Sequence, residues 1–314
     1  MRIIRHLGSI SSAQQAVVAL GNFDGVHLGH QAVLARARAL ADAANAPFAV
    51  MTFQPHPRAW FNPALKPLNI YPLHQKLRLL AEAGADVTFV LRFDARLSGM
   101  SAEAFVQEIL HRALRVRHAV TGEHFMFGRG RGGDAAFLKR SAEALGFAYT
   151  QVAEVEDTPG MAASSSRIRA LLGEGRVAEA SALLGRPYAI TGRVQRGEGR
   201  GRQLGAPTAN LTLACIFRPA FGVYAVRARV PGGVWMDGVA NCGVRPTFGG
   251  TQPGLEVHCF EVREDMYGRR LEVRLLHYLR PERRFADAQA LAAQIAADMM
   301  QAKAALAQRK EEAL

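Results

Sequence analysis

Apolar residues follow two different patterns along the chain, and the change of pattern predicts two parts. In the first part, short apolar runs typical of buried strands alternate with segments whose apolar residues recur every three or four positions, as in helices. Strands separated by helices predict a doubly wound parallel α/β sheet. The expected strands are residues 16–21, 47–53, 86–93 and 117–122, and the expected helices are residues 34–46, 72–84, 101–114 and 134–146.

After Gly185-Arg186-Pro187 the pattern changes to closely spaced β runs punctuated by Gly, Pro and Asn, as in a small antiparallel barrel. From Ala286 onward, apolar residues at helical spacing predict a C-terminal amphipathic helix that packs on the barrel. We therefore expect two domains, residues 1–185 and 186–314. The expected barrel strands are residues 188–194, 207–213, 222–230, 234–243, 255–262 and 271–279.

The composition indicates the size of the core and the cellular compartment. A chain of 314 residues with 49% hydrophobic content can bury the cores of two ordinary domains. Its three cysteines form no C-x-x-C pair and are too few for a disulfide framework. Because no signal peptide and no run of eighteen apolar residues is present, we expect a cytoplasmic protein with no membrane partner.

The formal net charge of +12 raises nucleic acid as a partner. However, the chain has only five lysines, and its arginines are spread over the whole length without a basic tail. A small substrate rich in phosphate explains the basicity equally well, so we expect no nucleic-acid partner. An RNA- or polyanion-binding protein is the alternative from another functional class, and salt-sensitive binding to unrelated sequences is its signature.

The first candidate site follows the first expected strand. That strand runs directly into GNFDGVHLGH, so His27 and His30 stand where a strand turns into a helix. This is where a doubly wound sheet binds ligands, and the free N–H groups and helix dipole favour phosphate there. Two imidazoles add donors toward the same anion. The alternative is that both histidines only cap the helix.

GNFDGVHLGH resembles the signature of the H-x-G-H nucleotidyltransferases, and its Asn-Phe-Asp-Gly form resembles the bacterial FAD synthetases. The resemblance implies transfer of AMP from ATP to FMN with release of pyrophosphate. His27 and His30 then stabilise charge on the attacked phosphate, without a covalent enzyme intermediate. It also implies that the preceding residues bind the nucleotide, namely Gly21, Asn22, Phe23, Asp24 and Gly25.

A Ser-rich segment and a Pro-rich segment extend this resemblance. ASSSRIRALLGEG is similar to the family's segment that approaches ATP, which places Ser166 and Arg169 near the triphosphate as catalytic residues. An ordinary helix N-cap at Ser164 or Ser165 is the alternative. TFQPHPRAW, continued by Phe61, resembles the flavin-ring platform, a rigid apolar surface made by residues Pro55, Pro57 and Phe61.

The segment TGEHFMFGRGRGGD resembles a family loop beside the flavin, and the resemblance implies flavin contacts at His124 and Phe127. The family usually has an acidic or amide residue where this chain has His124. Because of this departure, the resemblance is less complete at the N-terminal site. A chain in which only one module is active is therefore an alternative.

The second candidate site opens with a flap rich in Gly and Arg, which permits close approach of the backbone to phosphates. No glycine is followed by lysine, so a Walker P-loop is excluded. The next residues, Pro207-Thr208-Ala209-Asn210, resemble the signature of the riboflavin kinases, which are six-stranded antiparallel β-barrels. The resemblance implies that Thr208 and Asn210 hold Mg²⁺ and ATP phosphates, since Mg²⁺ prefers oxygen ligands. A β-turn stabilised by Asn210 is the alternative.

Two later segments, GVANCGVRPTFGG and LEVHCFEVREDMYG, also resemble riboflavin kinases. In the second, Glu256 stands where the family has its catalytic base, which accepts the proton of the riboflavin 5′-hydroxyl. Alternation along the strand places Glu256 and His258 on one face. Substrate contacts are expected from the flap and from the first of these segments, at Gly199, Arg202, Asn241 and Arg245.

Together these resemblances run from Gly21 to about Arg284 and imply a bifunctional enzyme of flavin cofactor synthesis. The barrel would convert riboflavin and ATP to FMN, and the α/β module would convert FMN and ATP to FAD, both with Mg²⁺. Its expected partners are these small molecules alone, and we expect a monomer or a weak homo-oligomer.

Overall fold

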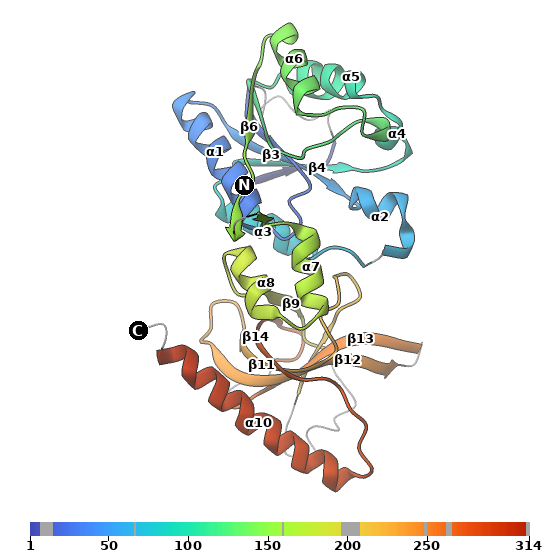
Figure 1. Ribbon diagram of the computed structural model, residues 1–314, viewed down its shortest axis with the longest axis vertical. Helices are drawn as coiled ribbons and strands as arrows, with labels where there is room; N and C mark the ends of the chain where they lie inside the picture. The colour runs from blue at the N-terminus through green and yellow to red at the C-terminus, as the bar shows by residue number, and fades with distance from the viewer. Residues whose placement is uncertain are drawn as a thin grey trace. The chain divides into compact units, whose positions relative to one another are not determined.

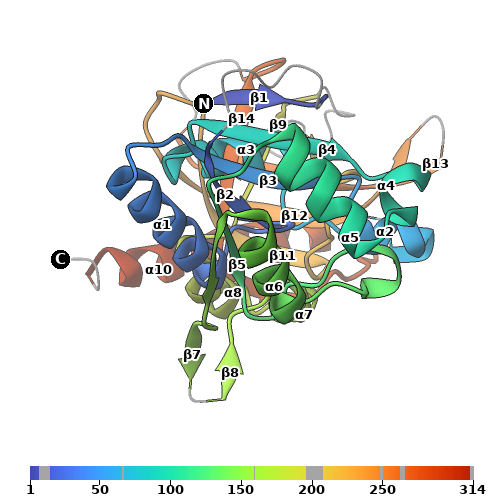
Figure 2. The ribbon, with the colours of Figure 1, turned by 90° about the horizontal axis from the view of Figure 1, so that it is seen from above.

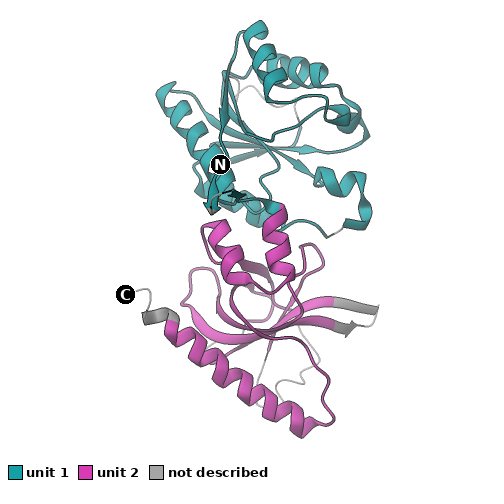
Figure 3. Ribbon diagram, viewed as in Figure 1, with its two compact units in different colours: residues 1–165 teal, residues 166–314 magenta. Residues whose placement is uncertain are grey.

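The computed structural model describes residues 1–6, 15–65, 67–158, 160–195, 208–247, 250–261 and 266–311. They form two compact units, residues 1–165 and residues 166–314, drawn in different colours in Figure 3. Each unit contains one six-stranded sheet. The element labels used below are those of Figure 1.

The first unit is built on a parallel sheet with strand order β1-β4-β3-β2-β5-β6. Successive strands run outward from β2 through β3 to β4, and then on the other side of β2 through β5 to β6. The order therefore reverses beside β2, which makes its carboxyl end the topological switch point where such sheets bind ligands. The strands are β1 (Arg2–Ile4), β2 (Val17–Leu20), β3 (Phe48–Gln54), β4 (Val87–Arg92), β5 (His118–Gly122) and β6 (Ala148–Val152).

Helices cover this sheet (Figures 1 and 2) because its strands are apolar on both faces. Val18 and Leu20 belong to a buried cluster that also contains residues of η3 and α6. The helix α1 buries Val33 and Leu34 and contacts β2, β3 and β5. The helices and helical turns are α1 (Leu28–Ala43), α2 (Pro57–Phe61), η2 (Pro63–Leu65), α3 (Leu73–Glu82), α4 (Ala95–Gly99), α5 (Ala102–Ala104), η3 (Phe105–Ala113), η4 (Arg129–Arg131) and α6 (Ala135–Leu145).

The predicted alternation of strands and helices is confirmed, and the structure adds elements that the patterns missed. The short strand β1 pairs with β4 in parallel, and β6 pairs with β5. A hairpin of β7 (Glu156–Thr158) and β8 (Met161–Ala162) stands apart from the sheet in Figure 2. The helix expected over 101–114 is present but changes winding: η3 is a π-helix, and it buries Phe105, Ile109 and Leu110 in the core.

The second unit contains an antiparallel sheet with strand order β10-β13-β12-β11-β14-β9. The two outer strands meet through a bridge between Gln195 and Asn210, where the amide of Gln195 donates to the carbonyl of Asn210 at 2.9 Å. The sheet is therefore a nearly closed barrel, as expected. Its strands are β9 (Ala189–Arg193), β10 (Ala209–Thr212), β11 (Gly222–Arg229), β12 (Met236–Thr247), β13 (Gly250–Cys259) and β14 (Arg270–Arg280).

Among the described residues of the second unit, three helices accompany the barrel: α7 (Ser165–Gly173), whose first residue belongs to the first unit, α8 (Val177–Leu184) and α10 (Ala288–Glu311). The predicted C-terminal helix α10 packs on the barrel, burying Ala302 and Leu306 against Ala225 and Leu276. The helix α8 contacts β14, and the amide of Tyr188 donates to the hydroxyl of Ser181 at 3.0 Å. The domain boundary after residue 185 stays a prediction.

Candidate active sites

His27 and His30 lie at the carboxyl end of β2, at the switch point of the parallel sheet. Their rings stack with centroids 3.7 Å apart and an angle of 27° between the planes. His27 is the N-terminal capping residue of α1 by position, yet its side chain makes no capping hydrogen bond. The alternative that His27 caps the helix is therefore not what the structure shows. The pair presents two imidazoles beside the start of α1, the end that favours anions.

Gly29 allows this stacking. A Cβ at Gly29 would lie 3.3 Å from the His27 ring and 3.4 Å from the carbonyl oxygen of Ala163. A methyl group there would require the His27 ring to move by a few tenths of an ångström. The glycine of the H-x-G-H string thus leaves room for the close approach of the first histidine.

The loop between β2 and His27 is held in an unusual conformation. Phe23 has φ 49°, Gly25 φ 82° and Val26 φ 45°. A β-branched residue such as Val26 pays a steric cost at positive φ, and such conformations persist only where the surroundings hold them. The loop that carries the histidines is therefore a strained segment fixed by its neighbours.

Several contacts hold this loop. The carboxylate of Asp24 accepts a hydrogen bond from the Ile70 amide at 2.9 Å. The main-chain carbonyl oxygen of Asp24 accepts one from the hydroxyl of Ser165 at 2.9 Å. Asp24 is buried, with 3% of its surface exposed. The Oδ1 atom of Asn22 is buried and has no hydrogen-bond partner among the described residues. An unsatisfied buried acceptor is unusual in a folded protein, and a ligand or an ordered water can supply the missing donor.

The segment after β3 exposes aromatic rings. A cis peptide bond joins Gln54 to Pro55, and Pro57 begins α2. Phe61 at the end of α2 is 68% exposed, and Trp60, which the sequence analysis did not select, is 38% exposed. Large exposed rings close to a ligand-binding edge are typical of a surface for a flat aromatic ligand.

His124 and Phe127 follow β5 and have different surroundings. His124 is exposed, pairs with Glu154 at 3.1 Å, and lines a cavity of about 670 Å³ near the ends of β5 and β6. Phe127 is buried against the rings of Phe105 and Phe125 in the core of the sheet. The carboxylate of Glu154 therefore lies beside the position where the family usually has an acidic or amide residue. The flavin contacts at His124 and Phe127 stay predictions.

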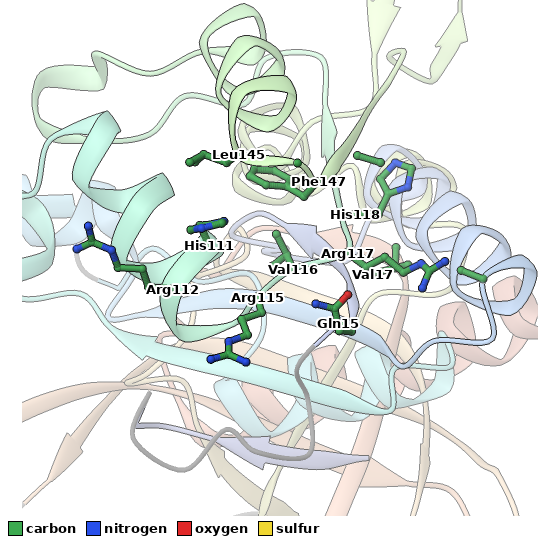
Figure 4. Close-up of a pocket in the computed structure, with 13 residues that line it drawn as sticks. Gln15, Val17, His111, Arg112, Arg115, Val116, Arg117, His118, Leu145 and Phe147 are labelled. Carbon is green, nitrogen blue, oxygen red and sulfur yellow. The ribbon is translucent and has the colours of Figure 1, made fainter.

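A second cavity, of about 740 Å³, lies at the opposite edge of the sheet (Figure 4). It is lined by the beginnings of β2, β5 and β6 and has a rim of basic side chains. The guanidinium groups of Arg112 and Arg115 point away from its centre in Figure 4. Since the carboxyl ends of the strands carry the ligand site in such sheets, this cavity is separate from the His27 site.

Ser166 and Arg169 lie on α7, in the second unit. Ser166 is exposed, whereas Arg169 is buried with 6% of its surface accessible. Ser165, the first residue of α7, bonds to Asp24 of the histidine loop, as described above. The expected contacts of Ser166 and Arg169 with a triphosphate stay predictions.

In the barrel, three predicted polar residues lie side by side on neighbouring strands. Asn210 on β10 pairs in register with Glu256 on β13, and Glu256 pairs with Asn241 on β12. Directly opposite residues of antiparallel strands present their side chains on the same face. Their strand neighbours Leu211, Leu255 and Cys242 are buried at 0–1% exposure. The row therefore lies on the outer face of the barrel, with Glu256 and Asn241 half-buried and Asn210 buried at 6% exposure.

A second carboxylate approaches this row. Asn241 donates to Oε1 of Glu282 at 3.2 Å. Gly243 provides the space, because a Cβ there would lie 1.9 Å from that same oxygen. Glu282 was not predicted from the sequence, since it follows the last strand and no part of its local pattern sets it apart.

Of the other residues predicted for this site, the structure describes Thr208 and Arg245. Thr208 precedes β10, and its carbonyl oxygen lies 3.5 Å from Nδ2 of Asn210, at the outer limit of a hydrogen bond. Arg245 lies on β12 opposite Gln252. Gly199 and Arg202 fall outside the described residues. Among the residues that the structure does describe, no group of three or more His, Cys, Asp or Glu side chains is arranged to hold a metal ion.

Comparisons with known proteins match the two parts of the chain to two different family models. The FAD synthetase family model matches residues 9–167, and the riboflavin kinase model matches residues 184–306. A bifunctional riboflavin kinase/FMN adenylyltransferase of Escherichia coli K12 is 40% identical over 96% of this chain and 97% of its own length. Proteins of the same description from Haemophilus influenzae and Bacillus subtilis are 38% and 37% identical over at least 95% of both chains.

A solved structure described as a macrolide-efflux protein from Streptococcus pneumoniae has the same fold. It matches with a TM-score of 0.82 and 32% identity over 94% of this chain and 96% of that chain. In the described part of this chain, no helix has the length and apolar character needed to span a membrane.

The fold and the two sites thus define a class: a nucleotidyltransferase-type α/β unit followed by a flavokinase-type barrel. Within that class, the identity over nearly its whole length shows that the chain belongs to the family of bifunctional riboflavin kinases/FMN adenylyltransferases.

Proposed function

We propose that this chain phosphorylates riboflavin to FMN at the barrel and adenylates FMN to FAD at the parallel sheet, using ATP in both reactions. The observation that carries the proposal is that each compact unit has its own cluster of polar residues, one at the end of β2 and one across β10, β13 and β12. Each cluster falls within the segment matched by the corresponding family model.

In the kinase reaction, the 5′-hydroxyl oxygen of riboflavin attacks the γ-phosphorus of ATP, and ADP leaves with the electrons of the broken P–O bond. Glu256 accepts the hydroxyl proton. The half-buried position of Glu256 between Asn210 and Asn241 supports this role, because its carboxylate is accessible and flanked by two amides. Asn241 and Glu282 hold each other in place at the side of this row.

Mg²⁺ fits the donor set at this site. The oxygens of Thr208, Asn210 and the neighbouring Glu256 are the hard ligands that Mg²⁺ prefers, with ATP phosphates and water completing its shell. The ion would be held by Thr208 and Asn210, and it would neutralise charge on the phosphates of ATP. Gly199, Arg202 and Arg245 complete the proposed substrate contacts of this module.

In the adenylyl transfer, a phosphate oxygen of FMN attacks the α-phosphorus of ATP, and pyrophosphate leaves. His27 and His30 stabilise the negative charge that develops on the transferred phosphate. Their stacked arrangement at the positive end of α1 supports this role. The rest of the loop, Gly21 to Gly25, contacts the nucleotide, and Ser166 and Arg169 bind phosphate oxygens.

The flavin of this second reaction stacks on the exposed rings after β3. Pro55, Pro57 and Phe61 form the platform, and Trp60 extends it. His124 and Phe127 are the proposed contacts from the loop after β5. In the cell, we place the enzyme in the cytoplasm as a monomer or weak homo-oligomer that acts on small molecules and not on nucleic acid.

The experiment that tests this proposal is an HPLC time course with riboflavin, ATP and Mg²⁺. The purified chain should form FMN first and FAD later, with ADP and pyrophosphate as the other products. If FMN forms but FAD does not, only the kinase module is active. If the purified chain forms neither flavin and instead binds RNA in a filter assay with steep salt dependence, the proposal is wrong.

A further inference from the structure

Lys76 is a buried cation that the proposed chemistry does not yet use. It lies on α3 with 7% of its surface exposed. An ammonium group loses its hydration on burial, which costs free energy unless hydrogen bonds and an opposite charge compensate. Asp24 supplies the opposite charge, but burial outweighs it and lowers the pKa of Lys76 to about 8.

The ammonium group of Lys76 joins two strand ends. Its Nζ donates to the carbonyl oxygen of Asn22 at 3.1 Å and to Oγ1 of Thr52 at 2.9 Å. The hydroxyl of Thr52 in turn donates to the same Asn22 carbonyl at 2.8 Å. Asn22 follows β2 and Thr52 lies near the end of β3. The lysine therefore ties α3 to the edge of the sheet that carries the His27 site.

The contact falls near the start of the strained loop. Directly after Asn22, Phe23 and Val26 take positive φ values of 49° and 45°. A loop in this conformation needs surrounding contacts to persist. An apolar side chain of equal length, such as methionine, would fill the same space without the cost of a buried charge. The ammonium group thus serves the conformation of the loop and not the packing of α3.

We infer that Lys76 is a positioning residue for adenylyl transfer: by holding the Asn22 carbonyl and the Thr52 hydroxyl, it fixes the loop that orients His27 and His30. This inference rests on the proposed function of the first unit. Lys76 acts through the loop and does not touch substrate. Displacement of a catalytic group by about 1 Å costs on the order of 10²-fold in rate, so loss of this contact should reduce catalysis to that extent.

The test compares three variants in the full-length chain. Lys76→Met keeps the length of the side chain and removes its charge and donors. Thr52→Val removes one of the two acceptors with little change of shape. Arg78→Met removes a cation from the exposed part of the same helix and serves as the matched control. FAD formation from FMN and ATP is measured as kcat and KM, with FMN formation from riboflavin as the control for folding.

We expect Lys76→Met to lower kcat for FAD formation about 10²-fold, and Thr52→Val about 10-fold, with KM for ATP changed less than threefold. Arg78→Met and the kinase reaction should stay unchanged.

Two results would overturn the inference. One is FAD formation by Lys76→Met within threefold of the unmodified chain. The other is an equal loss of FMN and FAD formation, which would indicate damage to the fold. If Lys76→Met does not fold, Thr52→Val decides: a normal kcat for FAD formation in that variant would contradict the role of Lys76. An unmodified chain that forms no FAD would refute the proposed function itself.

Discussion

The ion pair between β14 and α10 should contribute strongly to the stability of the barrel. Arg280 contacts Asp298 through two hydrogen bonds, Nε to Oδ1 at 2.8 Å and Nη2 to Oδ2 at 2.7 Å. The Asp298 side chain is 5% exposed and that of Arg280 is 18% exposed. Gln294 donates to the same carboxylate at 2.7 Å. The pair is therefore buried and bidentate, unlike an exposed surface pair.

Asp298→Ala would leave the guanidinium group of Arg280 without its partner. Removal of one member of a buried pair costs about 3–5 kcal/mol, and the partial exposure of Arg280 points to the lower end of this range. For a unit of this size, about 3 kcal/mol corresponds to a decrease in Tm of roughly 6–12 °C. The double variant Arg280→Met with Asp298→Leu removes both charges and should lie within about 1 kcal/mol of the unmodified chain.

Urea denaturation followed by tryptophan fluorescence measures this effect. The chain has two tryptophans, and Trp60→Phe leaves Trp235 as the reporter of the barrel. The guanidinium groups of Arg229 and Arg274 lie 4.2 and 3.9 Å from the ring centre of Trp235, so unfolding should change its emission. A loss below about 1 kcal/mol in Asp298→Ala would refute the reasoning, because the pair would then behave as an exposed one.

Three further predictions concern the boundary, the pH dependence and the histidine loop. Residues 186–314 should fold and phosphorylate riboflavin, and residues 166–314 should show a higher Tm because α8 stays on the barrel; an insoluble or inactive shorter fragment would contradict the predicted boundary. Because the folded pKa of Lys76 is about 8 and the unfolded value 10.5, the unfolded chain binds more protons between these pH values. The unfolding free energy of the unmodified chain should therefore rise with pH by up to about 3 kcal/mol relative to that of Lys76→Met. If urea denaturation gives the same difference between the two chains at pH 7.5 and at pH 10, the prediction is wrong. Gly29→Ala should lower FAD formation about 10-fold or more by pressing on His27, with FMN formation unchanged in the same HPLC assay.

Local patterns predicted most of the fold because the two hydrophobic periods differ clearly. They missed β1 and β6, for different reasons. The strand β1 has three residues, too few to show a period, and is recognised only by its pairing with β4. The strand β6 reads Ala148 to Val152 and is half-exposed, so its residues do not form the apolar run expected of a buried strand.

The candidate sites were predictable where a residue type is tied to a local motif. His27 and His30 stand in such a motif, as does Glu256 in its strand. The supporting residues were not predictable, because their roles come from tertiary contacts. Lys76 looks like an ordinary polar position of a helix until its distances to Asn22 and Thr52 are known.

The most direct test of the central claim is a product analysis of two variants with separate substrates. His27→Ala with His30→Ala should convert riboflavin to FMN at the normal rate and form no FAD. Glu256→Gln should lose FMN formation by about 10²-fold to 10⁴-fold, the usual effect of losing a general base, and should still convert added FMN to FAD normally. If either folded variant loses both reactions, or Glu256→Gln phosphorylates riboflavin within about threefold of the unmodified chain, the assignment of one reaction to each unit is wrong.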